Sequence, residues 1–319
     1  MKTVDVITNK IVIVGAGQVG ATTAFALMIS GRASEIVLID LNRAKAEGEV
    51  MDLNHGIAFT KPVSIKLGDY DDCKNADVII LAAGANQKPG ETRIDLVHKN
   101  TAIFKDIVSK IIAVERNAIL LVVTNPVDIL TYVTLKVSKL SPCQVIGSGT
   151  VLDTARFRSL LSQHCQVDPR NIHAYILGEH GDTEVPIWSR VMIGANFLDD
   201  FCVQCKKECD RVKTKEHIFY KVKNAAYEII ERKGATYYAV ALGVVRIVEA
   251  ILRNESSILT VSSYLDNYCG LKDVCLSVPT IIGSEGVLAQ VPVPMTEEEK
   301  QAFIDSGNAM KKIIEQLKL

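Results

Sequence analysis

The sequence of 319 residues predicts an α/β protein: a doubly wound parallel sheet of six strands, followed by a mixed α+β domain. Two observations support this fold class. Up to about residue 150, β-branched apolar runs alternate with segments long enough for crossover helices. Beyond that point the predicted helices are longer and the predicted strands are less regular. We therefore expect one domain over residues 1–150 and a second over residues 151–319, with a cleft between them.

The predicted parallel strands are apolar along their whole length, as strands buried on both faces are. In order, they are "KIVIVGA", "EIVLID", "VSIKLG", "DVIILAAG", "AILLVVTN" and "QVIGSG". Six such strands complete a dinucleotide-binding (Rossmann) sheet. In the second domain, apolar spacing predicts a helix from His217 to Gly234, and "ILTVSSYL" and "VCLSVPTII" predict antiparallel strands. Thr296 and Glu299 form a capping box that opens a C-terminal helix.

Composition and charge exclude several classes of protein. The chain is 48% hydrophobic and 23% charged, which is ordinary for a folded protein with a sizeable core. Its formal net charge is −1, so no overall field favours nucleic acid or an anionic membrane. No apolar run approaches the roughly 20 residues of a membrane span, and "MKTVDVITNK" lacks the apolar stretch of a signal peptide. We expect a cytoplasmic protein without nucleic-acid or membrane partners.

The eight cysteines are scattered, which suggests reduced thiols and not a disulfide framework. The segment "CVQCKKEC" holds three of them, Cys202, Cys205 and Cys209, which with His217 could bind a metal. No second CxxC pair completes a tetrahedral set. Their spacing also places all three on one helix face, where cysteine behaves as a small buried hydrophobe. The second interpretation is favoured, and no metal site is expected.

A glycine-rich turn predicts the cofactor site. In "IVIVGAGQVG", a strand leads into a turn that contains Gly15, Gly17 and Gly20 at G-x-G-x-x-G spacing. Gln18 lies inside this turn, and a helical segment follows it. Such a turn brings backbone N–H groups and a helix N-terminus close to a pyrophosphate. Asp40 ends the second strand, where it can accept hydrogen bonds from ribose hydroxyls and would repel a 2′-phosphate. NAD is therefore predicted; the alternative is a plain glycine turn with a surface aspartate.

The chemical site is predicted around one histidine. In "AYILGEHGDTEVP", His180 lies between glycines after an apolar strand, a position suited to a working imidazole, although a single histidine is more often structural. In "GTVLDTARFR", Asp153 and Arg156 lie three positions apart, about 60° around a helix, so both can face one cleft. The alternative for this pair is a solvated surface contact. The loop "AAGANQKPGETR" follows a strand end and adds Gln87 and Arg93.

Five motifs occur in one order: "GAGQVG", "AGANQKPGETR", "VTNPVDI", "DTARFR" and "GEHGDTEVP". Together they resemble the L-lactate dehydrogenases, and among these the bacterial type activated by fructose 1,6-bisphosphate. The resemblance runs along nearly the whole chain. It implies NAD as cofactor, pyruvate and (S)-lactate as substrate and product, a role in glycolysis and fermentation, and a homotetramer.

The resemblance also implies roles for the site residues. His180 would be the acid–base group, with Asp153 holding its tautomer and stabilising the imidazolium. Arg156 would clamp the substrate carboxylate, and Arg93 would polarise the reacting carbonyl. Asn125 matches a residue that lies near the nicotinamide and the reacting carbonyl in that family, and Thr236 matches a residue on the wall of the substrate pocket. Further matched positions line the cofactor site: Val19, Lys45, Tyr70, Gly84, Ala85, Val123 and Ser148.

Gln87 separates two related substrate classes. In the sister family, the malate dehydrogenases, an arginine at the matching position pairs with the second carboxylate of oxaloacetate. A neutral glutamine would leave that carboxylate unpaired in a closed site, at a cost of several kcal/mol, so Gln87 favours pyruvate. Gly84 and Gly90 suit hinge motion of this loop. Malate dehydrogenase, a non-catalytic NAD-binding sensor and an NAD-dependent glycosidase with a metal site are the competing functions.

Arg158 and His173 have no role in this active site. Arg158 lies five positions from Asp153, roughly 140° around the helix, and His173 lies seven positions before His180. Both should therefore face away from the cleft if their elements are regular. In the bacterial enzymes that the sequence resembles, an arginine and a histidine at these positions bind fructose 1,6-bisphosphate across a subunit interface. The resemblance thus implies allosteric activation through Arg158 and His173.

Overall fold

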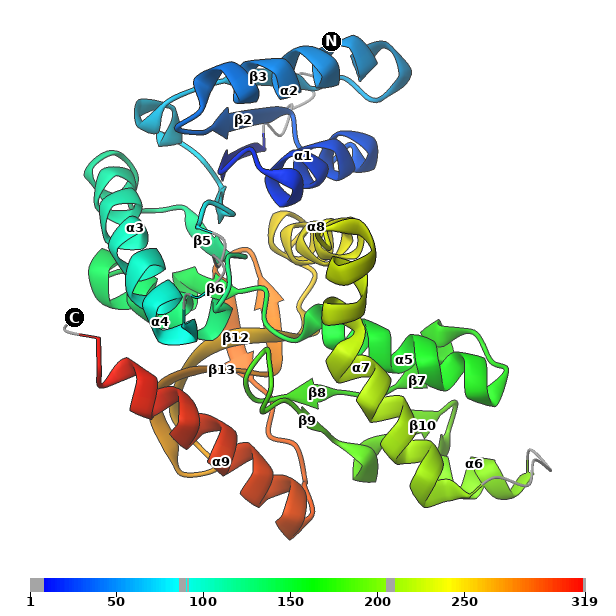
Figure 1. Cartoon of the computed structure of the whole chain (residues 1–319). Coiled ribbons are helices and arrows are strands. Elements are labelled where there is room, and N and C mark those ends of the chain that lie inside the picture. Colours follow the sequence, from blue (N-terminus) through cyan, green and yellow to red (C-terminus); the bar gives the residue numbers. More distant parts are fainter. Residues whose placement is uncertain (1–8, 86–89, 91, 205–209, 318–319) are drawn as a thin grey trace.

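The computed structural model describes residues 9–85, 90, 92–204 and 210–317 (Figure 1). Within these residues, nine strands form one sheet in the order β14-β13-β12-β6-β5-β4-β1-β2-β3. The part from β6 to β3 is parallel and has the strand order of a dinucleotide-binding sheet. Its strands lie in the predicted segments: β1 Lys10–Val14, β2 Glu35–Ile39, β3 Ser64–Leu67, β4 Val78–Leu81, β5 Ile119–Val122 and β6 Val145–Gly147. The predicted fold class is confirmed.

The parallel strands are apolar on both faces because helices cover both. In β1, Ile11 and Ile13 pack with residues of one set of helices, whereas Val12 and Val14 pack with the other set. The first set is α1 Gln18–Ser30, α2 Arg43–Gly56 and α8 Tyr238–Leu252. The second set is α3 Arg93–Val114 and α4 Val127–Ser138. Helix α8 comes from the second half of the chain and lies beside α1 (Figure 1).

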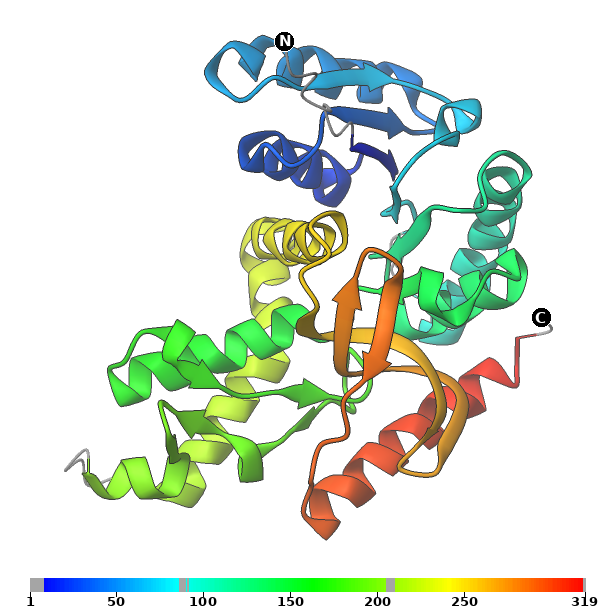
Figure 2. The ribbon, with the colours of Figure 1, turned by 180° about the vertical axis from the view of Figure 1, so that it is seen from behind.

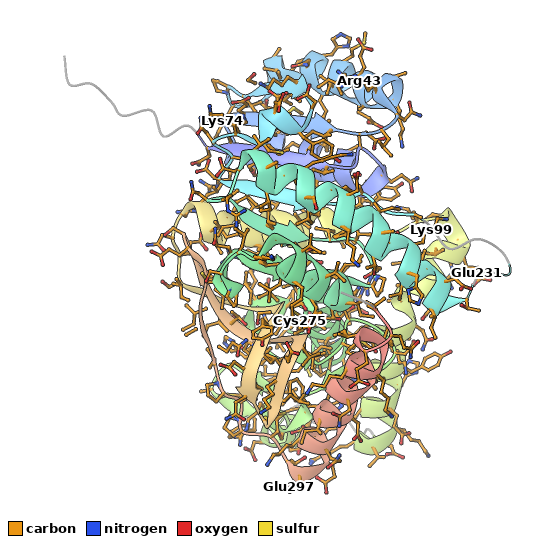
Figure 3. All side chains as sticks on the ribbon, turned by 90° about the vertical axis from the view of Figure 1, so that its left-hand side faces the viewer. Arg43, Lys74, Lys99, Glu231, Cys275 and Glu297 are labelled. Atoms are coloured by element: carbon orange, nitrogen blue, oxygen red, sulfur yellow. The ribbon has the colours of Figure 1, made fainter. Side chains whose placement is uncertain are left out.

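The second half of the chain extends the sheet. The predicted antiparallel strands are confirmed as β12 Ser257–Tyr268 and β13 Leu271–Gly283, and β14 Gly286–Gln290 follows them. Strand β12 also pairs with β6, which makes the hairpin part of the large sheet (Figure 2). Cys275 of β13 is buried in the interior (Figure 3). Helix α9, Glu297–Ile314, packs on β13 and begins at the predicted capping box of Thr296 and Glu299.

A separate apolar core holds the remaining elements together. It is built from α5 Val151–Cys165, α6 Leu198–Gln204, α7 Arg211–Lys233 and short strands. The predicted helix is confirmed in α7: it ends at Gly234 in the left-handed conformation, but it begins earlier, because the Asp210 side chain accepts the N–H of Lys213. The short strands are β7 Ile172–His173, β8 Ile176–Leu177, β9 Val185–Pro186, β10 Met192–Ile193 and β11 Asn196–Phe197.

Short 3₁₀ helices connect several of these elements: η1 Ile57–Phe59, η2 Tyr70–Cys73, η3 Pro142–Gln144, η4 Pro169–Asn171 and η5 Trp188–Arg190. The helices of the described ranges are all too short or too polar to cross a bilayer. The loops between β1 and α1, between β4 and α3, and after β8 carry several of the predicted site residues.

Candidate active site

The turn between β1 and α1 needs its glycines for two different reasons. Gly15 has φ +107°, and a Cβ there would lie 2.5 Å from the Ala83 nitrogen. A Cβ on Gly20 would lie 1.8 Å from the Gly15 carbonyl oxygen. Both glycines therefore let the chain turn tightly. Around Gly17, in contrast, a Cβ would meet no atom within 4 Å.

The space over Gly17 fits a pyrophosphate. Gly17 is the N-cap of α1, and no side chain caps this helix. The first N–H groups of the helix are therefore available to an anion, and the helix dipole favours a negative charge there. Gln18, Val19 and Gly20 form the first turn of the helix, which therefore begins three residues before the predicted helical segment. The structure thus offers the cradle that the nucleotide requires.

Asp40 lies beside this cradle. It follows β2, and its Oδ2 accepts the N–H of Ala16 at 2.7 Å while its Oδ1 accepts the N–H of Asn42 at 2.8 Å. These two hydrogen bonds fix the carboxylate against the glycine turn. A carboxylate has further lone pairs for ribose hydroxyls, and its charge opposes a 2′-phosphate. The observed position fits NAD better than its phosphorylated form.

A cavity of about 150 Å³ brings cofactor and catalytic positions together. It lies next to the carboxyl ends of β5 and β6 and is closed by α5, α7 and α8. Among its lining residues are seven predicted site residues: Val19, Val123, Asn125, Ser148, Arg156, His180 and Thr236. The rest of the lining is largely apolar, so that a bound ligand is shielded from water.

Besides the glycine turn and Asp40, four more predicted cofactor residues lie outside this cavity. Lys45 is exposed on α2, and Tyr70 is half-buried in η2. Gly84 and Ala85 follow β4, where a Cβ on Gly84 would lie 2.4 Å from the Thr124 side chain. The loop therefore passes close to the end of β5 and needs a glycine there.

His180, the predicted acid–base group, is half-buried among charged partners. The Asp153 carboxylate divides its two oxygens: Oδ2 bonds to His180 Nδ1 at 2.5 Å, and Oδ1 accepts from Arg156 Nη1 at 2.8 Å. Asp153 is buried in the first turn of α5, and His180 follows β8. Because Nδ1 is engaged, Nε2 is the ring nitrogen that can exchange a proton with a ligand in the cavity. The predicted pair on one helix face is confirmed, and it is not a solvated contact.

Electrostatics keep this histidine protonated. Burial lowers the pKa of His180, but the negative charge and hydrogen bond of Asp153 outweigh it and raise the pKa to about 9. Burial likewise raises the pKa of Asp153, yet the neighbouring His180 and Arg156 hold it below its ordinary value. The imidazole is therefore a proton donor at neutral pH, and Asp153 stays ionised.

The loop "AAGANQKPGETR" is only partly covered by the structure. Gln87 lies outside the described residues. Gly90 has φ +83°, a conformation that favours glycine. Arg93 is the first residue of α3, which begins at a capping box formed by Thr92 and Asp95. The N-terminus of α3 thus fixes the backbone where the loop ends.

Sequence reasoning missed two polar residues of the site. Asn100 is fully buried on α3; its side chain accepts the N–H of Ala85 at 2.8 Å and donates to the Asn125 carbonyl at 3.1 Å. It therefore joins the loop to the cavity wall. A polar residue at an apolar position of α3 was the only local signal. The second residue, Asp128, lies in the first turn of α4 and accepts the N–H of His180.

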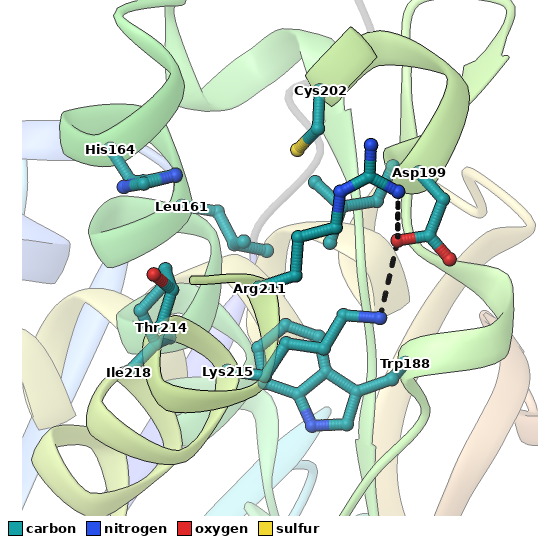
Figure 4. Close-up of a pocket in the computed structure, with 10 residues that line it drawn as sticks. Leu161, His164, Trp188, Asp199, Cys202, Arg211, Thr214, Lys215 and Ile218 are labelled. Carbon is teal, nitrogen blue, oxygen red and sulfur yellow. Dashed lines mark hydrogen bonds and ion pairs between the residues drawn. The ribbon is translucent and has the colours of Figure 1, made fainter. Parts of the chain in front are cut away.

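A second cavity lies between α5, α6 and α7 (Figure 4). Asp199 pairs there with Lys215 at 3.3 Å and with Arg211 at 4.0 Å, and Lys215 lies 5.7 Å from the centre of the Trp188 ring. Cys202 is on its wall, whereas Cys205 and Cys209 lie outside the described residues. No cluster of metal-binding side chains occurs in the part of the chain that the structure describes. The lining includes none of the predicted site residues.

Arg158 and His173 lie close together on the outside of this half. Arg158 Nε donates to the carbonyl of Ala174, next to His173, at 3.1 Å. His173 is exposed at the end of β7. The assumption of one regular strand from His173 to His180 is wrong, because β7 and β8 are separate strands in different sheets. Even so, neither residue lines the active-site cavity.

Two family models match the chain. Residues 9–147 match the lactate/malate dehydrogenase NAD binding domain, and residues 150–318 match the lactate/malate dehydrogenase alpha/beta C-terminal domain. The chain belongs to the lactate/malate dehydrogenase family. It is accordingly an NAD-dependent oxidoreductase, and the cradle at Gly17 and the hydrogen-bonded pair of His180 and Asp153 agree with this.

Several members of this family are similar over their full length. The chain is 60% identical to an L-lactate dehydrogenase of Acetivibrio thermocellus, with 98% of each chain covered. It is 52% identical to an L-lactate dehydrogenase of Geobacillus stearothermophilus, with 96% of each covered. Among solved structures, minor L-lactate dehydrogenase from Enterococcus mundtii in its ligands-bound form has a TM-score of 0.94 and 43% identity, covering 98% of this chain and 99% of that chain.

Proposed function

We propose that this dehydrogenase interconverts pyruvate and (S)-lactate. One observation carries the proposal: a protonated His180, held by Asp153, faces the same cavity as Arg156 and the nicotinamide-side residues. Residues 1–150 would hold NAD, and residues 151–319 would supply the acid–base and carboxylate-binding groups. The names of the similar proteins, L-lactate dehydrogenases, support the same substrate pair.

Each residue contributes a distinct part of the reaction. Arg156 binds the substrate carboxylate through its guanidinium fork. NADH, when bound, supplies the hydride that the carbonyl carbon receives. His180 donates its Nε2 proton to the carbonyl oxygen, so pyruvate gains one hydride and one proton and becomes lactate. Asp153 stabilises the imidazolium beforehand, and Arg93 stabilises the charge that grows on the oxygen. Asn125 and Thr236 shape the cavity around the substrate.

Gln87 selects the substrate in this proposal. It offers no charge to a second carboxylate, so a closed loop would bury the extra carboxylate of oxaloacetate without a partner. The test is NADH oxidation with pyruvate and with oxaloacetate, for the unchanged chain and for Gln87→Arg. Pyruvate should be strongly preferred by the first, and the variant should move the kcat/KM ratio toward oxaloacetate. If the unchanged chain reduced oxaloacetate better, malate dehydrogenase would be the function.

Activation by fructose 1,6-bisphosphate is the regulatory part of the proposal. Arg158 is half-buried, and within the described residues no carboxylate pairs with it. Its guanidinium and the His173 imidazole are therefore suited to a phosphate group. In a two-fold assembly, two such sites would meet the two ends of one bisphosphate.

The exposed surface of α1 and α8 favours an assembly of identical subunits, which we expect to be a tetramer. Helices α1 and α8 lie side by side and expose large apolar residues: Phe25, Ile29, Tyr238 and Leu242. Apolar groups gathered in this way favour an interface over solvent. A cytoplasmic location, with a role in glycolysis and fermentation, completes the proposal.

A further inference from the structure

Two loops of the site follow neighbouring strands and share one buried hydrogen-bond partner. The loop after β4 contains Gly84 and Ala85, and the loop after β5 contains Asn125, which lines the active-site cavity. Strands β4 and β5 pair in parallel, so both loops leave the same edge of the sheet. The side chain of Asn100, fully buried on α3, hydrogen-bonds to both loops.

The Asn100 amide is fully engaged by the two loops. Its Oδ1 accepts the N–H of Ala85 at 2.8 Å. Its Nδ2 donates to the carbonyl of Ala85 at 3.4 Å and to the carbonyl of Asn125 at 3.1 Å. An amide nitrogen carries two hydrogens, so each of them has an acceptor. The orientation is thereby fixed, because an amide turned by 180° would place its nitrogen against the Ala85 N–H and its oxygen against the Asn125 carbonyl.

A second side chain already joins the two strand ends. The Thr124 hydroxyl donates to the carbonyl of Ala83 at 2.9 Å, one position before the residues that Asn100 holds. Asn100 therefore adds a tie farther along both loops, at the peptide groups of Ala85 and Asn125. The family resemblance implies that these two residues lie against the cofactor. The buried amide thus holds in register two parts of the wall that the cofactor would contact.

We propose that Asn100 is a positioning residue for the nicotinamide: it fixes the backbones of Ala85 and Asn125 relative to each other and so sets where the reactive end of the cofactor lies. This inference rests on the proposed function, in which Asn125 shapes the cavity around the substrate. A positioning amide should matter at the nicotinamide end and leave the adenosine end, at Gly17 and Asp40, unaffected.

The test uses two cofactor probes that differ only at one end. NADH occupies the whole cofactor site, whereas ADP-ribose lacks the nicotinamide ring and should contact only the glycine turn and Asp40. The affinities of both are measured by isothermal titration calorimetry, which needs no turnover. The kcat for pyruvate is measured in parallel.

Two variants change Asn100, and one adjacent variant is the control. Asn100→Ala removes all three hydrogen bonds. Asn100→Asp keeps an acceptor for the Ala85 N–H, but an ionised carboxylate has no hydrogen for either carbonyl. Thr101→Val is the matched control on the same helix: Thr101 is also buried, and its hydroxyl has no hydrogen-bond partner among the residues that the structure describes.

Both Asn100 variants should lower NADH affinity by about 10-fold, the factor that corresponds to one well-made hydrogen bond, with ADP-ribose affinity unchanged. Their kcat should fall by about 10- to 100-fold, because a small misplacement of the reacting groups is costly. In Asn100→Asp the loss of NADH affinity should be smaller at about pH 5 than at about pH 8, because a protonated acid regains one donor and burial raises its pKa. Asn100→Ala should show no such difference, and Thr101→Val should match the unchanged chain.

The two probes also define the contrary results. An equal loss of NADH and ADP-ribose affinity, or no loss of either, would show a merely structural amide and overturn the inference. If Asn100→Ala does not fold, Asn100→Asp carries the test; if neither folds, Asn100 is a folding determinant and the inference fails. An unchanged chain that does not reduce pyruvate, with the difference between the two probes intact, would contradict the proposed function alone.

Discussion

The two ends of the active site are built by different means. The cofactor end is mostly backbone: a turn of three glycines, an uncapped helix and one carboxylate fixed by two N–H groups. The chemical end is mostly buried charge: Asp153, Arg156, His180 and Asp128 come from three separate elements. In the proposed function, the first end binds NAD through shape and oriented dipoles, and the second end sets the protonation of the His180 ring.

This difference predicts how each end fails. A change at the backbone end should alter affinity or folding and leave the chemistry of the bound complex intact. A change at the charged end should alter turnover and its pH dependence and leave the cofactor bound. Variants at the two ends can therefore test whether binding and chemistry are separable in this chain.

The largest effect is expected from His180→Asn. Loss of the proton donor should lower kcat by about 10²- to 10⁴-fold, the usual contribution of a positioned acid or base. NADH affinity, measured by fluorescence titration, should remain near that of the unchanged enzyme, because the cradle at Gly17 does not involve the imidazole. Nearly normal turnover would remove His180 from the mechanism, whereas loss of NADH binding would show that the two ends are not separable.

The same variant should change how stability depends on pH. The folded pKa of His180 is raised from its ordinary value of 6.5 to about 9. Its protonated form therefore contributes stability that is complete below pH 6.5 and disappears as the pH rises through about 9. His180→Asn should lack this contribution, which thermal unfolding of the cofactor-free protein across that range would detect.

A smaller effect is expected at the backbone end, where two glycines should behave differently. In Gly17→Ala the new Cβ projects into open space, so the fold should persist while NADH affinity falls by about 10- to 100-fold, the loss of a charge-assisted hydrogen bond. In Gly20→Ala the Cβ would overlap the Gly15 carbonyl, so the cofactor-free protein itself should lose stability, by about 1–3 kcal/mol.

Gly48→Ala is the control for this pair. Gly48 lies inside α2, where a Cβ would meet no atom within 4 Å. NADH affinity should not change there, and helix stability should rise slightly. If Gly17→Ala bound NADH normally, the space over that residue would not be where the pyrophosphate lies.

The sequence allowed prediction of the backbone end more fully than of the charged end. Glycine spacing and strand periodicity describe local geometry, so β1 and the turn were predicted in place, whereas α1 begins three residues before the predicted helical segment. Asp153, Arg156 and His180 were found because two short motifs hold them. Asp128 and Asn100 were not predicted, because their hydrogen bonds join positions far apart in the sequence. Asp128 bonds to a residue 52 positions away, and Asn100 bonds to residues 15 and 25 positions away, so no local pattern indicates these contacts. The pairing of β12 with β6 was missed for the same reason.

Arg158 and His173 belong to neither end of the site, and they give the smallest predicted effect. The structure places Arg158 against the carbonyl of Ala174, beside His173, on a face away from the cavity. A bisphosphate bound there could act on turnover only through the assembly, by stabilising the arrangement of subunits that binds substrate. Its effect should therefore be largest when the enzyme is dilute and when its histidines are neutral.

We expect fructose 1,6-bisphosphate to lower the KM for pyruvate by about 5-fold or more, since such coupling is typically 1–3 kcal/mol. Arg158→Ala and His173→Ala should each remove this response and leave turnover at saturating pyruvate unchanged. Arg170→Ala is the matched control: Arg170 is an exposed arginine of η4 already paired with Asp168, and its loss should leave the response intact. Activation that survives both of the first two variants would place the effector elsewhere. If Arg158→Ala or His173→Ala lowered turnover at saturating pyruvate without the bisphosphate, this outer face and the charged end of the active site would be coupled without any ligand.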